Sequence, residues 1–360
     1  MLTLFAALLY DVPVPVQPAV KTPLPVQSER NATLDCIKGF AICLVVWGHC
    51  IQYLSAGSNE QYLQDPVFAI IYSFHMPLFM AISGYLFYAS QHRYGGRDLL
   101  IKKAKHLLLP AAAWWVLMLA LRYVIHILTG SGITSAFHNI FWFLTANMFC
   151  AVVVYFCAEL AKGSAAVYFL APAMLLLLAL PDGFDLKYDK FMLPYFAAGF
   201  LFCRHSRRIA PMAYGVAWIA SLAAFCIMMM HWKTEYYIYT TGMSLYVPDP
   251  EHKLLIIGFR YLAGFAGIGS VVPAVHLLLR RAAAPLLTFL GRHTMGIYVL
   301  SVPLSPSLRF LRVPYLSGPL YDWVTTPLFA CAVCALCIAG TRILQRAKVT
   351  RLVLLGEVSR

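Results

Sequence analysis

Two ionisable residues in the first long apolar segment, Lys38 and His49, lie eleven positions apart. Eleven residues of an α-helix complete three turns plus about 20°, so both side chains share one face, about 16 Å apart along the axis. A nearly unperturbed imidazole is a natural proton acceptor near neutral pH, which makes His49 a candidate general base. Asp35 lies one turn before Lys38 and can pair with its ammonium group. The spacing predicts a slot with Lys38 at one end and His49 at the other.

Other ionisable residues also lie inside apolar segments, where each charge costs about 2.5–3.5 kcal/mol and therefore suggests a function. We expect His75, in the second segment, to lie near the level of His49. Arg122 in the third segment and Arg260 in the eighth are expected to complete an outer cluster with these histidines. Either arginine is equally suited to bonding backbone carbonyl groups, so both interpretations stay open.

A second, inner cluster is expected around Lys38. Arg292, near the inner end of the ninth segment, joins Asp35 and Lys38 in this cluster. The cluster continues into a basic stretch that contains Arg97, Lys102, Lys103 and Lys105. The sequence has no HExxH motif or histidine-rich tract, and two histidines alone make an incomplete zinc site, so we expect no metal.

The composition excludes most soluble folds. Apolar residues make up 61% of the 360 residues and charged residues 12%, whereas soluble domains average about 45–50% and about 25%. The mean hydropathy is +0.72. The net charge of +13 does not indicate a nucleic-acid partner, because the basic residues cluster in short segments between apolar runs, which is typical of membrane topology. All ten cysteines lie in or beside apolar runs, so no disulfide framework is expected.

We therefore predict an all-α integral membrane protein with about ten transmembrane helices. A span needs about 20 mostly apolar residues. Eighteen Lys and Arg residues fall in one alternating set of connecting segments and six in the other, which predicts that both termini are cytoplasmic. Residues 1–33 form a Pro-rich cytoplasmic leader, 34–341 the membrane domain and 342–360 a basic cytoplasmic tail. The predicted spans are roughly 34–54, 66–88, 107–128, 137–158, 164–181, 190–204, 210–230, 254–279, 285–305 and 320–341.

Several motifs resemble those of the acyltransferase family 3 membrane proteins, bacterial O-acyltransferases typified by fucose 4-O-acetylase-like enzymes. The first span resembles the opening signature of that family, in which a basic residue precedes a histidine by eleven positions. Ser301 stands where the family pattern often has a histidine. The resemblance covers about residues 30–302 and rests on Asp35-x-x-Lys38-Gly39, Val45-Val46-Trp47-Gly48-His49, Phe74-His75-Met76-Pro77-Leu78-Phe79, Ser83-Gly84-Tyr85, Pro110, Trp142-Phe143-Leu144, Leu193-Pro194-Tyr195-Phe196 with Gly199, and Gly291-Arg-His-Thr294-Met-Gly-Ile297-Tyr298.

The resemblance implies ten or so helices in a bacterial inner membrane and an acyl-CoA donor, such as acetyl-CoA, taken from the cytoplasm. It also implies an acceptor hydroxyl on a sugar of a surface or exported glycan or a lipid-linked saccharide. Acyl-CoA is then a co-substrate and no cofactor stays bound. The only other expected partner is membrane lipid.

A mechanism follows as a hypothesis. His49 acts as the general base and His75 or Arg260 stabilises the oxyanion. An acetyl-His49 intermediate is a second route. Asp35, Lys38, Arg122, Arg260 and Arg292 are the expected substrate-binding residues, and the donor phosphates are expected to meet Arg97, Lys102, Lys103, Lys105 and Arg292.

The competing interpretation is a polytopic transporter or exporter of a glycan or small solute, because buried ionisable residues also suit proton relays. Apart from Asp35 and Glu159 near span ends, the predicted spans contain no carboxylate. A proton-coupled carrier usually needs an acidic relay, so the sequence favours the acyltransferase.

Overall fold

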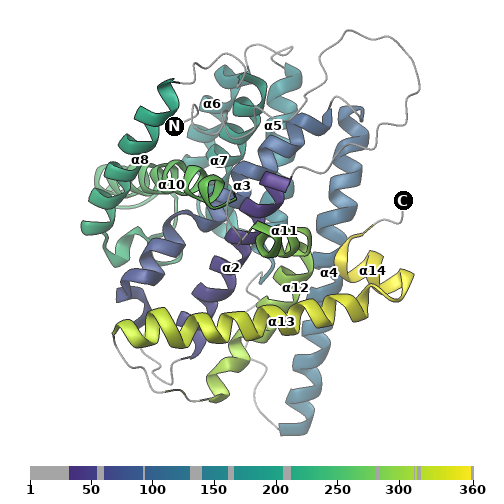
Figure 1. Cartoon of the computed structure of the whole chain (residues 1–360). Coiled ribbons are helices and arrows are strands. Elements are labelled where there is room, and N and C mark those ends of the chain that lie inside the picture. Colours follow the sequence, from purple (N-terminus) through teal and green to yellow (C-terminus); the bar gives the residue numbers. More distant parts are fainter. Residues whose placement is uncertain are drawn as a thin grey trace.

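The computed structural model of the chain describes residues 32–54, 61–91, 94–129, 140–160, 166–205, 212–279, 284–311, 313 and 318–357. The predicted leader, residues 1–33, lies outside the described residues except for its last two positions. Several basic residues that indicate orientation, among them Arg93 and Lys162, also lie outside them. In the described part of the chain all elements are helices, which confirms the all-α prediction (Figure 1).

Helices occupy the described part of every predicted span. Six of these helices have the length and apolar composition to cross a membrane: those within 32–54, 66–91, 96–128, 142–160, 250–277 and 321–344. The other predicted spans fall on shorter, more polar or broken helices, so the count of ten and the cytoplasmic termini stay predictions. The α-helices are α2 (Ala32–Leu54), α3 (Pro66–Gln91), α4 (Gly96–Thr129), α5 (Trp142–Leu160), α6 (Ala166–Ala179), α7 (Leu186–His205), α8 (Met212–Met230), α9 (Ile238–Thr241), α10 (Pro250–Leu279), α11 (Ala284–Arg292), α12 (Thr294–Leu304), α13 (Thr326–Leu344) and α14 (Lys348–Leu355).

Short turns of other helix types connect these elements. The 3₁₀ turns are η1 (Gln61–Gln64), η2 (Gly183–Asp185), η4 (Thr234–Tyr236) and η5 (Ser305–Leu311), and a π-helical turn, η6 (Tyr321–Thr325), precedes α13. The ninth predicted span is broken at His293, whose backbone leaves the helical region between α11 and α12.

The first predicted span, α2, forms the centre of the fold. In Figure 1, α2 lies in the middle, α13 crosses in front of it, and α4 with α14 stands to one side. Helix α2 packs against α3, α11 and α13, and buried residues occur all around it. A helix that is apolar on every side is stable only when other helices enclose it. The residues that sequence analysis singled out in this span are therefore held in the interior of the bundle.

Glycines allow two helix pairs to touch along their backbones. A Cβ atom at Gly39 would lie 2.7 Å from the carbonyl carbon of Leu287 in α11, and one at Gly291 would meet the backbone of α2. Gly84 and Gly199 form an equivalent pair where α3 crosses α7. Small residues at such crossings let helices approach closely in lipid. The first crossing fixes α2 beside the end of α11, where Arg292 lies.

Candidate functional site

Two cavities meet in the interior of the bundle. The larger, which we call the lysine chamber, has a volume of about 770 Å³ and is lined by Lys38, Lys102 and Lys103. The smaller, the histidine chamber, has a volume of about 400 Å³ and is lined by His49 and His75. Both chambers are lined by Val45, Met76 and Tyr298, so these three side chains lie at the boundary between them, which we call the junction. The two residues predicted to mark the ends of a slot thus line different chambers, with Lys38 in one and His49 in the other.

Asp35 holds the predicted inner cluster together. Oδ1 of its carboxylate forms an ion pair with Nζ of Lys38 at 2.6 Å, and Nε of Arg292 lies 3.7 Å from Oδ2. The carboxylate is almost completely buried, whereas the Arg292 side chain is half exposed. The cluster therefore reaches from the protein interior to the surface at the Lys38 end of the slot.

Basic side chains from α4 line the lysine chamber. Lys102, Lys103 and His106 face it, and Nζ of Lys103 lies 5.8 Å and 5.5 Å from the ring centres of Phe87 and Phe196. Arg97 and Lys105 are exposed and are not among the described residues that line either chamber. The structure thus brings two of the four predicted loop cations into the chamber.

The segment at the end of α14 closes one side of the lysine chamber. Gly356 and Glu357 line the cavity. The carbonyl oxygen of Gly356 lies 2.8 Å from Nδ1 of His106, and Nε1 of Trp114 donates to the carbonyl of Leu354 at 2.9 Å. Gly356 has φ +66°, a left-handed conformation that ends α14 and that favours glycine. The chamber wall is therefore built from α4 and from a segment about 250 residues later in the chain.

Aromatic side chains dominate the histidine chamber. Trp142 and Tyr188 stack with ring centres 4.3 Å apart, and Tyr72 packs edge-on against His75 at 4.8 Å. The hydroxyl of Tyr72 donates to Oε1 of Gln52 at 3.4 Å, and Gln52 also lines the cavity. The remaining aromatic lining residues are Tyr53, Tyr62, Phe191, Tyr239 and Tyr298.

Hydrogen bonds determine which nitrogen of each histidine carries the proton. Nδ1 of His75 lies 2.7 Å from the carbonyl oxygen of Ile71, which only accepts, so Nδ1 carries the hydrogen. The Ser305 hydroxyl donates its hydrogen to the carbonyl of Ser301 at 2.6 Å, so its oxygen accepts from Nδ1 of His49 at 3.4 Å. In both neutral rings Nε2 therefore has a free lone pair and acts as a proton acceptor.

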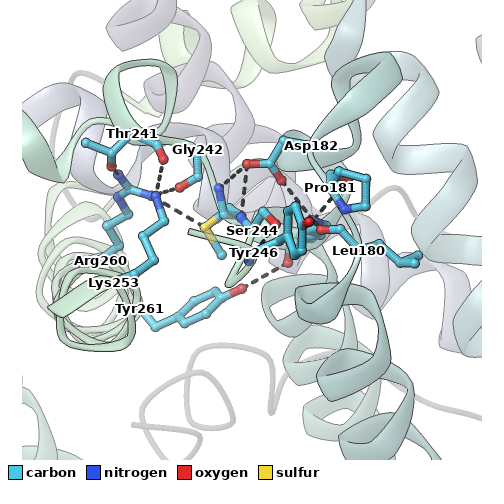
Figure 2. A network of polar contacts seen from close by, with 12 residues as sticks. Leu180, Pro181, Asp182, Thr241, Gly242, Ser244, Tyr246, Lys253, Arg260 and Tyr261 are labelled. Carbon is cyan, nitrogen blue, oxygen red and sulfur yellow. Dashed lines mark hydrogen bonds and ion pairs between the residues drawn. The ribbon is translucent and has the colours of Figure 1, made fainter. Parts of the chain in front are cut away.

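Arg260 lies behind the histidine chamber rather than in its lining. It is 2% exposed. Nε donates to the carbonyl of Tyr236 at 2.8 Å, and a terminal nitrogen donates to the carbonyls of Glu235 (2.8 Å) and Tyr237 (2.9 Å). The terminal nitrogens also donate to the carbonyl of Gly242 and to the hydroxyl of Thr241, as Figure 2 shows. These contacts match the carbonyl-bonding interpretation of this residue.

Arg122 also lies away from the histidines. Its side chain is exposed on α4, and it is not among the described residues that line either chamber. Of the expected outer cluster, the structure brings His49 and His75 together in one cavity and leaves both arginines outside it.

Several lining residues have no counterpart in the sequence analysis. Gln52, Tyr239, His106 and the Gly356 segment belong to no motif, and Ser305 reaches His49 from a 3₁₀ turn after α12. The one available signal is the run Tyr236-Tyr237-Ile-Tyr239, which is unusually aromatic for a connection between two apolar segments.

Comparison with known proteins gives one family and two relatives. A family model described as "Acyltransferase domain" matches residues 31–346. "Nodulation protein NolL" of Mesorhizobium japonicum (strain LMG 29417 / CECT 9101 / MAFF 303099) is 28% identical over 297 residues, which cover 76% of each chain. "Nodulation protein NolL" of Sinorhizobium fredii (strain NBRC 101917 / NGR234) is 28% identical over 249 residues, or 64% of this chain and 65% of the relative. No solved structure matches.

Proposed function

Because the chain belongs to the acyltransferase family 3 membrane proteins, we propose that it transfers an acetyl or similar short acyl group from acyl-CoA to a sugar hydroxyl. The acceptor is a surface or exported glycan or a lipid-linked saccharide, and the enzyme lies in the inner membrane with its lysine chamber toward the cytoplasm. The meeting of a cationic cavity and a histidine-lined cavity at Val45, Met76 and Tyr298 carries this proposal. Donor and acceptor enter from opposite sides and react where the cavities join.

The lysine chamber is suited to an anionic donor. Phosphate groups are bound in proteins by clustered Lys and Arg side chains. Lys102 and Lys103 line the chamber on α4, and Lys38 lines it on α2, the helix that also carries Val45 of the junction. We assign the phosphates of acyl-CoA to the α4 lysines and the thioester arm to the path past Lys38. Arg292, half exposed beside Asp35, lies at the entrance to this path.

His49 is suited to remove the proton of the acceptor hydroxyl. Its Nε2 lone pair accepts this proton while the sugar oxygen attacks the thioester carbonyl carbon. The new C–O bond forms, the C–S bond breaks, and the CoA thiolate leaves with the proton that His49 returns. The Nε2 lone pair of His75 accepts a hydrogen bond from a second hydroxyl of the acceptor.

The oxyanion needs a hydrogen-bond donor. The N–H groups of Arg260 are engaged with the backbone, and neutral His75 presents a lone pair. Among the described lining residues, the Gln52 amide is a donor that remains available, and we assign the oxyanion to it.

The test is transfer of label from [¹⁴C]acetyl-CoA into glycan by membranes that contain the wild type, His49→Gln or His205→Gln. His205 is the control, because it is a helical histidine, with Nδ1 2.9 Å from the carbonyl of Leu201, and it is not among the described lining residues. We expect full transfer with His205→Gln and a loss of about 10²–10⁴-fold with His49→Gln. Equal transfer by all three proteins would exclude His49 as the base. No transfer by any of them would favour the transporter.

A further inference from the structure

The segment between α8 and α10 covers the histidine chamber, and we call residues 234–244 the roof segment. It contains η4 and α9. Ile238 and Tyr239 of this segment line the chamber. The other side of the segment faces Arg260, whose guanidinium group bonds to four of its carbonyl oxygens. The roof is thus held by a side chain that does not itself reach the cavity.

A second set of contacts holds the far end of the roof segment, as Figure 2 shows. The backbone N–H groups of Met243 and Ser244 donate to Oδ2 of Asp182 at 2.6 and 3.0 Å. The other oxygen of Asp182 accepts from Nζ of Lys190 at 2.8 Å. Burial alone would raise the pKa of Asp182, but Lys190 and the two N–H groups lower it below its ordinary value. The roof is therefore fixed at both ends before any ligand binds, and a preorganised site loses less entropy on binding.

The hydroxyl of Tyr239 is the feature that points to a ligand. Its ring packs edge-on against Tyr72 at 6.2 Å, and Tyr72 packs in the same way against His75. The Tyr239 hydroxyl is buried and has no hydrogen-bond partner among the described residues. Burial raises the pKa of Tyr239 well above its ordinary value, so the hydroxyl keeps its hydrogen. A buried hydroxyl is unfavourable without a partner, and a ligand in the chamber supplies one.

The chamber lining selects against charge and favours a ring with many hydroxyl groups. Asp185 is the one carboxylate among the described lining residues, and none of these residues is Lys or Arg. The guanidinium group of Arg309 lies 4.8 Å from the ring centre of Tyr53, outside this lining. An anionic sugar in the chamber would lie near the Asp185 carboxylate without a facing cation. The volume of about 400 Å³ is typical of a small-molecule site.

We propose that the histidine chamber binds one uncharged sugar ring of the acceptor, with the Tyr239 hydroxyl hydrogen-bonded to it. Arg260 is a positioning residue that sets the place of Tyr239 through the roof segment. The inference rests on the proposed glycan acceptor and specifies its class, a neutral pyranoside rather than an acidic sugar. Stacked aromatic rings such as Trp142 and Tyr188 supply the apolar faces against which a sugar ring packs.

The experiment uses the full chain in phosphatidylethanolamine and phosphatidylglycerol vesicles without acyl-CoA. Diethylpyrocarbonate modifies the free imidazole nitrogen, and peptide mass spectrometry measures its rate at His49. The probes are the methyl glycosides of glucose, galactose and mannose, and methyl glucuronide as the acidic counterpart. We expect a neutral glycoside to slow the modification of His49 and methyl glucuronide to have no effect.

Tyr237→Phe is the matched control for Tyr239→Phe, since both tyrosines lie in the roof segment with rings stacked at 5.4 Å and only Tyr239 lines the chamber. Protection should persist in Tyr237→Phe and need about tenfold more glycoside in Tyr239→Phe. Arg260→Lys should weaken it to a similar extent. Equal protection in both Phe variants, protection by the glucuronide, or no protection by any neutral glycoside would overturn the proposal. Because no acyl donor is present, these outcomes are independent of whether the chain transfers acetyl groups.

Discussion

A methyl group at position 39 should separate the two halves of the inner cluster. In Gly39→Ala the new Cβ would lie 2.7 Å from the carbonyl carbon of Leu287 and 3.0 Å from the backbone nitrogen of Gly291. Ordinary contacts begin at 3.4 Å. Both clashing atoms belong to the backbone of α11, so no side-chain rotation relieves them.

The size of the effect follows from this shortfall. Helices α2 and α11 must move apart by more than 0.7 Å, the difference between 3.4 and 2.7 Å, because the carbonyl oxygen of Leu287 lies nearer to the new Cβ than its carbon does. Lys38 is the neighbour of Gly39 on α2, and Arg292 ends α11, so the shift acts directly on the Asp35 cluster. A misplacement of about 1 Å can cost about 10² in rate. We therefore expect acetyl transfer to fall by about 100-fold.

The assay is the initial rate of label transfer from [¹⁴C]acetyl-CoA, normalised to folded protein by size-exclusion chromatography. Gly258→Ala is the matched control, because a Cβ there meets nothing within 4 Å. This variant should keep wild-type activity and gain up to about 1 kcal/mol of helix stability. If Gly39→Ala transfers label within twofold of Gly258→Ala, the backbone contact does not position the cluster and the reasoning is wrong.

Three further predictions test other parts of the site. Ser305→Ala should lower the transfer rate about tenfold at unchanged KM for acetyl-CoA, because the proton on His49 is no longer fixed to Nδ1. Ser301→Ala is the control: it keeps the backbone carbonyl that accepts from Ser305 and should leave the transfer rate unchanged. Lys38→Ala should raise the KM for acetyl-CoA about 10–100-fold, and an unchanged KM would remove Lys38 from the donor path. Asp182→Asn should speed amide hydrogen exchange in the roof segment at pH 7. Because the pKa of Asp182 is lowered, the ionised carboxylate stabilises the roof segment fully above about pH 4, and this stabilisation disappears as the pH falls through the lowered pKa. Equal exchange of both proteins at pH 7 would contradict this account.

Helical periodicity made the centre of the site predictable. Lys38 and His49 share a face because eleven residues nearly close three turns, and their helix is buried on all sides, so each of them lines one of the two neighbouring chambers. The Asp35 cluster followed from pairing one turn apart and from the high cost of a lone buried charge. His75 was predictable from its depth within the second segment.

The parts that sequence could not provide depend on contacts between distant segments. Burial alone did not distinguish an arginine that faces ligand from one that bonds carbonyls, and the partners of Arg260 come from a connection without a motif. The sequence predicts a similar depth in the membrane for Arg122 as for Arg260, but the Arg122 side chain is exposed on α4. Tyr239 and Gln52 became visible only once the cavity was known, because an aromatic or amide residue near a membrane boundary is usually explained by packing or by the interface.

The wall that Gly356 and His106 share sets an order of events during biogenesis. These residues are 250 positions apart, so α4 enters the membrane long before α14 leaves the ribosome. Until α14 docks, the lysine chamber lacks one side, although the α4 lysines and Lys38 have already been synthesised. If the chain binds acyl-CoA as proposed, its donor chamber is therefore completed only after α14 has been made, and a chain that stops before α14 lacks the Gly356 side of the chamber wall.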